Sequence, residues 1–411
     1  MMIMREQGAA KRASFVFFLL FVLLECLSIA AANVALGFSV FFIVIHLIKN
    51  LRGGLSQEIK TNLAIYKKWI FIFFLFWLGI LISALLSGDI SKGLRIFFGQ
   101  YVYRTVPFFL LIIFFARSKL ASLVLFVALF SCAIDVLGGL VLHPDAIRLK
   151  GLYGHPMTLA GFLTIGIPVL FCLLMDWHQK WNNLFTLAIF FFVAFVGLLL
   201  NGTRGAWLAV LVAVPVSSLF VDFSLKKAFF LLSLLLATAL IFLDSPRLQN
   251  RAQSITSTTL QSNTERVLMW NSAIKMFKDY PITGVGLGQY THRYQTEYIS
   301  SEAKERSQNH AHNNLIQMLA ENGIVGFSAF IAFFGFIFVT SLVALFKKKK
   351  KYGAVIFGCT LAFFLQGLTE FNFGNSAVIK YYWVVLGSLV ILLNENEKLL
   401  PFLYFLNNRK G

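Results

Sequence analysis

Long apolar stretches, separated by short polar connections, cover most of this chain. A transmembrane α-helix needs about 20 predominantly apolar residues, and about twelve stretches approach or reach that length. The pattern therefore predicts an all-α integral membrane protein with about twelve transmembrane helices. The predicted spans cover residues 14–31, 33–48, 69–87, 96–116, 120–142, 156–175, 183–200, 205–221, 227–243, 324–346, 354–370 and 378–394.

One long polar segment, residues 244–323, interrupts this alternation of spans and short connections. A connection of this length is usually functional. It divides the chain into residues 1–243 with the first nine spans, the large loop 244–323, and residues 324–411 with the last three spans and a short tail.

The large loop contains signals for short helices. Residues 246–262 are rich in Ser, Thr and Gln and predict an irregular segment, whereas Ser262 and Glu265 fit a capping box at a helix start. Gly284–Gly288 follows no strand, so it predicts a structural turn and not a nucleotide-binding loop. An amphipathic helix on the membrane surface is expected from four residues at helical spacing, Val267, Trp270, Ile274 and Phe277.

Composition supports the membrane class and limits the partners. The chain is 58% hydrophobic with 46 Phe, and its mean hydropathy is +0.76, which excludes an ordinary soluble domain. All four cysteines lie in apolar runs, so neither a disulfide framework nor a cysteine metal site is expected.

The net charge of +18 is explained by where the basic residues lie. Most Lys and Arg residues fall in the termini and in every second connection, which the positive-inside rule assigns to the cytoplasm. Both termini are therefore expected inside and loop 244–323 outside, and the chain is retained in the membrane in contact with lipids. The charge is a topology signal, so nucleic acid is excluded as a partner.

A histidine-rich stretch from Asn309 to Gly326 ends the large loop. Apolar residues at helical spacing follow His312, and Gly323 can end that short helix. His312 would then lie in the first helical turn, where the helix dipole favours a neutral imidazole that can act as a general base. The alternative interpretation is a polar cluster that only caps the helix.

Cations on the outer side of the membrane oppose the positive-inside rule and are candidate anion ligands. Arg204, within N-G-T-R-G-A-W, is placed at the outer boundary by the short connection between two spans, and Arg266 lies in the first turn of the loop helix. A guanidinium suits a phosphate. Snorkelling of Arg204 and a surface salt bridge from Arg266 are the alternatives. Further outward cations and a histidine predict a cationic rim suited to a diphosphate: Lys92, Arg95, Arg104, Arg148, Lys150 and His155.

Carboxylate pairs of the kind that hold Mg²⁺ or Mn²⁺ are missing from the expected outer connections, including the first, Ala30–Asn33. His310 and His312 are two residues apart, so on a helix they would point to opposite faces. A site without a metal or other cofactor is therefore expected, with arginines stabilising charge. Three acids near the outer ends of spans, Glu25, Asp135 and Glu370, are expected to make structural pairs with cations.

These residues resemble a known family. His312-Asn313, followed after nine residues by Gly323-Ile324-Val325-Gly326, resembles the His-(Asn/Ser/Gln)-x9-Gly-x-x-(Gly/Thr/Tyr) pattern of O-antigen ligases. The segment around Arg204 resembles the arginine motif ahead of their large periplasmic loop, and Pro281-x-x-Gly284-Val285-Gly286 resembles a PxxGVG stretch of the wider family. The likeness covers most of residues 200–326, while the first third matches only in layout.

The resemblance implies a metal-independent, inverting glycosyltransferase in the bacterial inner membrane. It implies that O-antigen on undecaprenyl diphosphate is the donor and that a sugar hydroxyl of lipid A-core is the acceptor. His312 would be the general base, while Arg204 and Arg266 would hold the leaving diphosphate. Residues expected to help bind substrate are Lys92, Arg95, His155, His310 and Asn313.

Three other functions are compatible with parts of this pattern. An O-antigen polymerase would use the same base and cations, but such proteins often divide their polar mass between two loops. A protein O-oligosaccharyltransferase tends to have an additional C-terminal domain. A transporter of lipid-linked glycans, a different class, would predict charges at mid-membrane and internal repeats.

Overall fold

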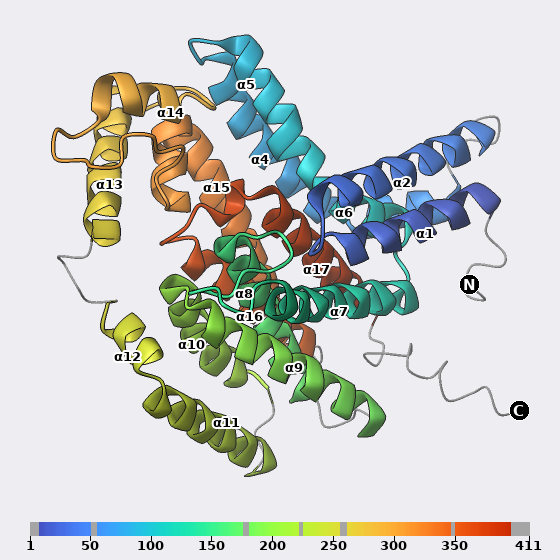
Figure 1. The fold of residues 1–411 in the computed structure, drawn as a ribbon. Helices are drawn as coiled ribbons and strands as arrows, with labels where there is room; N and C mark the ends of the chain where they lie inside the picture. The colour runs from blue at the N-terminus through green and yellow to red at the C-terminus, as the bar shows by residue number, and fades with distance from the viewer. Residues whose placement is uncertain are drawn as a thin grey trace, which may run out of the picture.

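The computed structural model describes residues 8–50, 56–175, 181–221, 225–254, 261–346 and 350–395, and these residues are folded as helices and their connections (Figure 1). Eight helical segments are long and apolar enough to cross a membrane, so the chain is a multi-pass membrane protein. They are α2 (Ile29–Asn50), α4 (Lys67–Leu85), the segment from α5 (Ile90–Ile96) to Phe114, α7 (Ser118–Leu142), α8 (Pro156–Leu174), α9 (Trp181–Asn201), α15 (Asn314–Phe346) and α17 (Ser376–Glu395).

The other four predicted spans also fall on helices. They correspond to α1 (Ala9–Leu24), α10 (Arg204–Ser218), α11 (Leu225–Asp244) and α16 (Lys350–Gln366). One boundary was wrong: α1 ends at Leu24 and α2 begins at Ile29, so the first connection is residues 25–28 and not Ala30–Asn33. This connection includes Glu25, and the apolar residues around it hide the turn from a hydropathy pattern.

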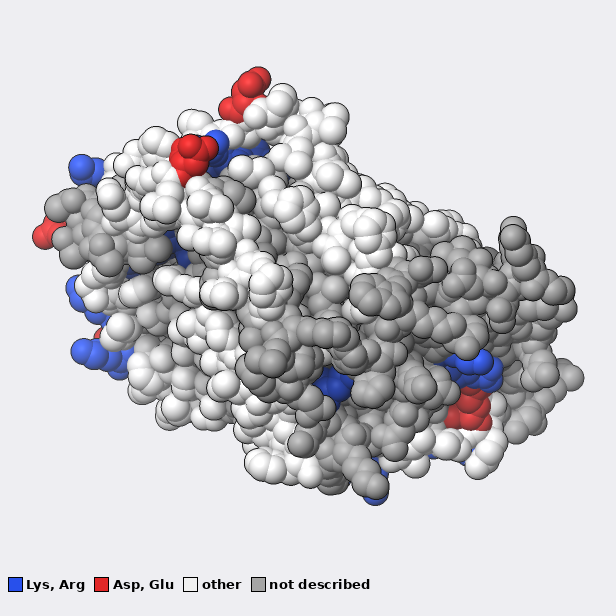
Figure 2. All heavy atoms as spheres, turned by 90° about the horizontal axis from the view of Figure 1, so that it is seen from below, with Lys and Arg blue, Asp and Glu red and all other residues white. Residues whose placement is uncertain are grey.

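Burial distinguishes the centre of the bundle from its lipid-facing side. In α8 and α17, 89% and 94% of the residues in the apolar window are buried, whereas in α2 the share is 28%. α8 and α17 therefore form the core, and exposed α2 residues such as Phe38 and Phe41 suit contact with lipid. On the face in Figure 2, most described side chains are uncharged, and the charged ones gather mainly near the left edge and at one place on the right.

A buried ion pair joins the first helices to the last. Lys380 of α17 and Glu25 are both almost fully buried, and the Lys380 Nζ lies 3.1 Å from Glu25 Oε1 and donates to Asn33 Oδ1 at 2.7 Å. Removing one partner of such a pair leaves an uncompensated buried charge. The structural pairing expected for Glu25 is confirmed, and Asp135 instead accepts a hydrogen bond from the backbone N–H of Leu152 at 2.6 Å.

The large loop folds on α15 and carries its own small core. Its helices are α12 (Pro246–Gln253), α13 (Gln261–Asp279) and α14 (Tyr290–Arg293). The expectation of an irregular segment at 246–262 was wrong for α12, whose first turn is capped by the Ser245 hydroxyl accepting from Leu248 N–H. Residues 255–260 lie outside the described part. The small core consists of Met269, Ala273, Met276, Val285, Tyr290, Tyr294, Ala311 and Ala320.

The buried face of α13 differs from the amphipathic face that was expected. Val267 and Ile274 are exposed, while Met269 is buried against the loop core. Trp270 donates its indole N–H to the Ala311 carbonyl at 2.9 Å, so this ring points toward the histidine stretch. The expected capping box fails as well, because Glu265 is buried and accepts from Lys304 N–H.

The glycine-rich turn fits against a bend in α15. Gly323 interrupts the helix with a φ of 56°, which confirms that the short helix after His312 ends there. A Cβ at Gly323 would lie 2.4 Å from the Ile282 carbonyl carbon, and one at Gly284 would lie 2.4 Å from that of Glu321. Only glycines allow this approach, in which Ile324 N–H bonds to the Pro281 carbonyl at 2.8 Å.

Candidate functional site

The start of α15 is fixed by Asn313. Its side-chain oxygen accepts from the N–H groups of Leu315 at 2.9 Å and Ile316 at 3.1 Å, so it caps the helix. His312 precedes this cap with a φ of 49°, and the expectation that it lies in the first turn was therefore wrong. A left-handed conformation is uncommon for a residue with a side chain, and such residues occur preferentially at functional sites.

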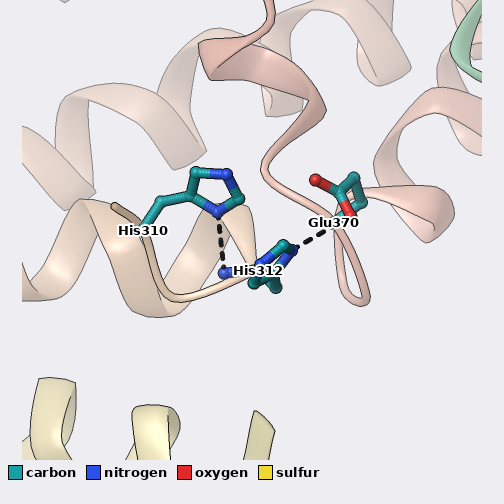
Figure 3. A group of neighbouring side chains, drawn as sticks. All are labelled: His310, His312 and Glu370. Carbon is teal, nitrogen blue, oxygen red and sulfur yellow. Dashed lines mark hydrogen bonds and ion pairs between the residues drawn. The ribbon is translucent and has the colours of Figure 1, made fainter. Parts of the chain in front are cut away.

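His312 faces a carboxylate from a distant part of the chain. Its Nδ1 lies 3.1 Å from Oε2 of Glu370, a residue in the connection between α16 and α17 (Figure 3). The His312 and Glu370 side chains are 25% and 13% exposed, so the pair is shielded but reachable. Burial alone would raise the pKa of Glu370, but His312, His310 and Arg266 together hold that pKa below its usual range.

Backbone and amide hydrogen bonds lock the two halves of this pair together. Asn313 Nδ2 donates to the Leu368 carbonyl at 2.9 Å, and Asn314 N–H donates to the Gly367 carbonyl at 2.6 Å. Asn314 also donates from its side chain to Asn372 Oδ1 at 2.7 Å. The connection after α16 is thus clamped to the start of α15, and Glu370 is held opposite His312.

His310 and His312 do not point to opposite faces, because neither lies on a helix. Their rings meet edge to face with centroids 4.1 Å apart, and the backbone N–H of His312 donates to His310 Nδ1 at 3.3 Å. Burial, with the nearby His312, lowers the pKa of His310 to about 4. His310 is therefore uncharged at neutral pH, and its ring forms one wall of the site.

Three potential metal-ligating groups meet here: His310, His312 and Glu370, whose ligand atoms lie within 4.8 Å of one another. These groups already make hydrogen bonds within the cluster. His310 Nδ1 accepts the backbone N–H of His312, and the Glu370 carboxylate pairs with the His312 ring. Nearby Arg266 adds positive charge that opposes a cation. The absence of a metal requirement stays a prediction.

Arg204 is buried, with 9% of the residue exposed, at the start of α10. Its guanidinium donates to the backbone carbonyl and hydroxyl of Ser254, to the hydroxyl of Ser262 at 3.2 Å and to Asn263 Oδ1 at 2.9 Å. These bonds hold α10 to both α12 and α13. The side chain is thus directed into the loop, and snorkelling does not describe its position.

Arginines from three further segments lie close enough to Arg204 to repel one another. Arg148 donates to the Asn201 carbonyl at 3.1 Å, and Arg251 donates to the Gly202 carbonyl at 2.9 Å. Burial, with Arg251, Arg204 and Arg266, lowers the pKa of Arg148 to about 10. Among the described residues, no carboxylate lies within ion-pair distance of any of these four arginines. Positive charge that is gathered in this way would favour an anionic ligand.

Arg266 connects this arginine group to the histidines. Burial lowers its pKa, Glu370 opposes that change, and its charge in turn lowers the pKa of His310. Within the described part of the chain, its guanidinium has no hydrogen-bond partner. A half-buried guanidinium without a partner is costly, and an anionic ligand would compensate for that cost.

A cavity of about 530 Å³ opens beside the arginines. Its polar wall includes Arg148, Arg247 and Arg251, and its apolar wall includes Leu199 and Leu200 at the end of α9. Sequence reasoning missed Arg251 as a site residue. The sequence signal that could have indicated its position is Ser245-Pro246, which is typical of a helix start. That helix is α12, and Arg251 lies in its last turn.

Three of the remaining residues of the predicted rim, His155, Lys92 and Arg95, are divided between two places. His155 is exposed before α8 and is close enough to lower the pKa of His310, so it belongs to the rim of the site. Lys92 lies beside Gly288 of the glycine-rich turn, and Arg95 is exposed on α5. In Figure 1, α5 is well separated from α12, so these two residues do not join the arginine group.

The fold and this site define a multi-pass membrane protein in which helix ends and one large loop assemble a histidine–glutamate pair beside clustered arginines. Residues 187–331 match the family model described as O-Antigen ligase. This stretch therefore carries an O-antigen ligase domain, of a family that acts in lipopolysaccharide biosynthesis, and the family expected from the motifs is confirmed. A search of curated proteins gave no match. Arg148 and Glu370 lie outside the matched residues.

Proposed function

We propose that this protein transfers O-antigen from undecaprenyl diphosphate to a sugar hydroxyl of lipid A-core. The observation that carries the proposal is the His312–Glu370 pair beside Arg266, because it combines a base with a partnerless cation. Twelve membrane crossings with both termini in the cytoplasm would place this site on the periplasmic side of the inner membrane, at the level of lipid headgroups.

In the proposed reaction, Glu370 orients His312 and His312 takes the proton. The Nδ1–H of the neutral ring donates to Glu370, which leaves Nε2 free to accept a proton from the acceptor hydroxyl. As the proton moves to Nε2, the hydroxyl oxygen forms a bond to the anomeric carbon of the donor. The Glu370 carboxylate then stabilises the imidazolium that results.

The arginines would stabilise the leaving group in the same step. The bond between the anomeric carbon and the diphosphate oxygen breaks, and its electron pair leaves with the diphosphate. Arg266 is close enough to influence His310, Arg148 and Arg204 are close to Arg266, and Arg148 also lines the cavity with Leu199 and Leu200. Preorganised guanidinium groups can supply this stabilisation without a metal. A single displacement inverts the anomeric carbon.

A direct test is transfer by the purified full-length protein in nanodiscs, with undecaprenyl-diphosphate-linked O-antigen and lipid A-core as the two substrates. Capped lipid A-core on a gel is the expected product. If the donor glycan instead grows longer while the core stays bare, the protein is a polymerase. If neither substrate is consumed by folded protein, the proposal fails.

Glu370→Gln is expected to lower kcat in this assay by roughly 10²-fold or more, because an amide neither fixes the required tautomer nor stabilises the imidazolium. The pKa of Glu370 is held low, so the carboxylate is ionised throughout the neutral range. The stability that the ionised Glu370 contributes to the folded protein is fully present above the usual carboxyl pKa. It is lost only as the pH falls through the lower pKa that Glu370 has in the folded state. Glu297→Gln, on the loop surface, is the matched control. Equal activity of both variants would remove Glu370 from the mechanism.

A further inference from the structure

A second cavity lies on the large loop, apart from the arginines. It measures about 390 Å³ and is formed between α13 and residues 298–302. The α13 residues that line it include Asn271, Lys275 and Lys278, whereas Met269, Ala273 and Met276 belong to the loop core on another face of that helix. The residues that line this cavity have no part in the mechanism above.

The walls of this cavity are held in place by hydrogen bonds. The Ser272 hydroxyl donates to the Tyr298 carbonyl at 2.7 Å, which joins α13 to the segment that follows α14. The Tyr298 hydroxyl donates to Asp279 Oδ2 at 2.7 Å, which fixes the half-buried ring. The cavity is therefore formed before any ligand binds, which reduces the ordering cost of binding.

Two lysines and one carboxylate, Glu302, line this cavity, so its formal charge is positive and favours an anion. Lys275 and Lys278 are exposed, and among the described residues no carboxylate lies within ion-pair distance of either ammonium group. The neighbouring Asp279 is already engaged by Tyr298. Lysine is a flexible point charge, so this pair suits phosphate or carboxylate groups of variable position better than a fixed bidentate contact.

The other groups suit a sugar ring. Asn271, Ser300 and Glu302 can donate to or accept from hydroxyl groups, and the Tyr298 ring offers an apolar surface to the C–H face of a sugar. A ligand with one anionic group, several hydroxyls and an apolar face would use all of these contacts at once. These properties describe an acidic or phosphorylated sugar.

The position of the cavity relates it to the reaction centre. Trp270, next to Asn271, donates to the Ala311 carbonyl, and Ala311 adjoins His312. The cavity therefore lies on α13, the same helix that contacts the histidine stretch, but on another face of that helix. A glycan whose reacting end lies at His312 can extend over α13 into this cavity.

We propose that the cavity between α13 and residues 298–302 binds an anionic sugar of a glycan substrate, a few sugars from the reacting end. This inference rests on the proposed function for the identity of the glycan. The anionic sugar can belong to the acceptor core or to the donor polymer, and the site chemistry is the same in both cases.

The test compares the double variant Lys275→Gln/Lys278→Gln with Lys304→Gln, a loop lysine outside the cavity. Full-length protein in nanodiscs of neutral phospholipid is assayed for the KM of lipid A-core and, separately, of the lipid-linked donor. The double variant is expected to raise one of the two KM values about five- to tenfold, with kcat within about twofold of wild type. The substrate affected identifies which glycan occupies the cavity.

Calorimetry separates failure of this inference from failure of the proposed function. Oligosaccharide released from lipid A-core and O-antigen glycan are each titrated into the same protein, without transfer. Binding of one glycan that the double variant loses supports the subsite even if wild-type protein shows no transfer. Unchanged KM values and unchanged binding, or equal effects in Lys304→Gln, would overturn it.

Discussion

Replacing His312 with alanine is expected to lower the rate of O-antigen transfer by roughly 10³-fold or more, while the protein still inserts and folds. The imidazole is the only group in the described site that combines a free ring nitrogen with a carboxylate partner. Alanine can also occupy the backbone position with little change in packing, because His312 makes its main side-chain contacts with His310 and Glu370.

The appropriate comparison for His312→Ala is His292→Ala, which removes an exposed histidine of α14 from the same loop. Initial transfer rates are measured on both variants at saturating donor and acceptor, with expression and thermal unfolding measured in parallel. Near-normal transfer by stably folded His312→Ala would exclude it as the base. A comparable loss in His292→Ala would indicate general damage to the loop.

Arg266→Gln is expected to lower kcat/KM for the lipid-linked donor by roughly 10²- to 10³-fold. Its guanidinium has no partner among the described residues and lies between the histidines and the other arginines. The loss should therefore reflect the missing stabilisation of the leaving diphosphate, with little effect on the KM of lipid A-core. Kinetics with each substrate varied in turn make this measurement.

Arg293→Gln provides the control for Arg266→Gln, because Arg293 is a surface residue that pairs with Glu297 on the same loop. Arg204 is less suitable than Arg266 for testing contact with the diphosphate. Its guanidinium holds α10 to Ser254 and Asn263, so its removal would also loosen the loop. Unchanged donor kinetics in folded Arg266→Gln would mean that this arginine does not contact the diphosphate.

The membrane architecture could be predicted from the sequence because bilayer thickness limits the length of each apolar stretch. Eight of the twelve predicted stretches correspond to helical segments long and apolar enough to cross a membrane, and the other four fall mostly on shorter or less apolar helices. The error at Glu25 arose because apolar residues surround it on both sides, so the hydropathy pattern continues through the connection at residues 25–28. The face of α13 was mistaken because Met269, Ala273 and Met276 are buried in the loop core, whereas Val267 and Ile274 are exposed.

The individual candidates for the site were visible in the sequence, but their arrangement was not. His312 and Glu370 are 58 residues apart, and they meet only because Asn313 and Asn314 clamp the connection after α16. Local spacing could not show this contact. The histidine pair was assigned to opposite faces because a helix was assumed, and the left-handed His312 makes that assumption wrong.

The central claim, ligation of O-antigen to lipid A-core, is tested most directly in a strain that lacks this protein. Its lipopolysaccharide is separated on a gel, and its undecaprenyl-linked glycan is assayed from the same cells. Bare core together with long polymer that remains on the lipid carrier is the expected result. Core capped by a single O-unit would indicate a polymerase, and an unchanged lipopolysaccharide ladder would contradict both assignments.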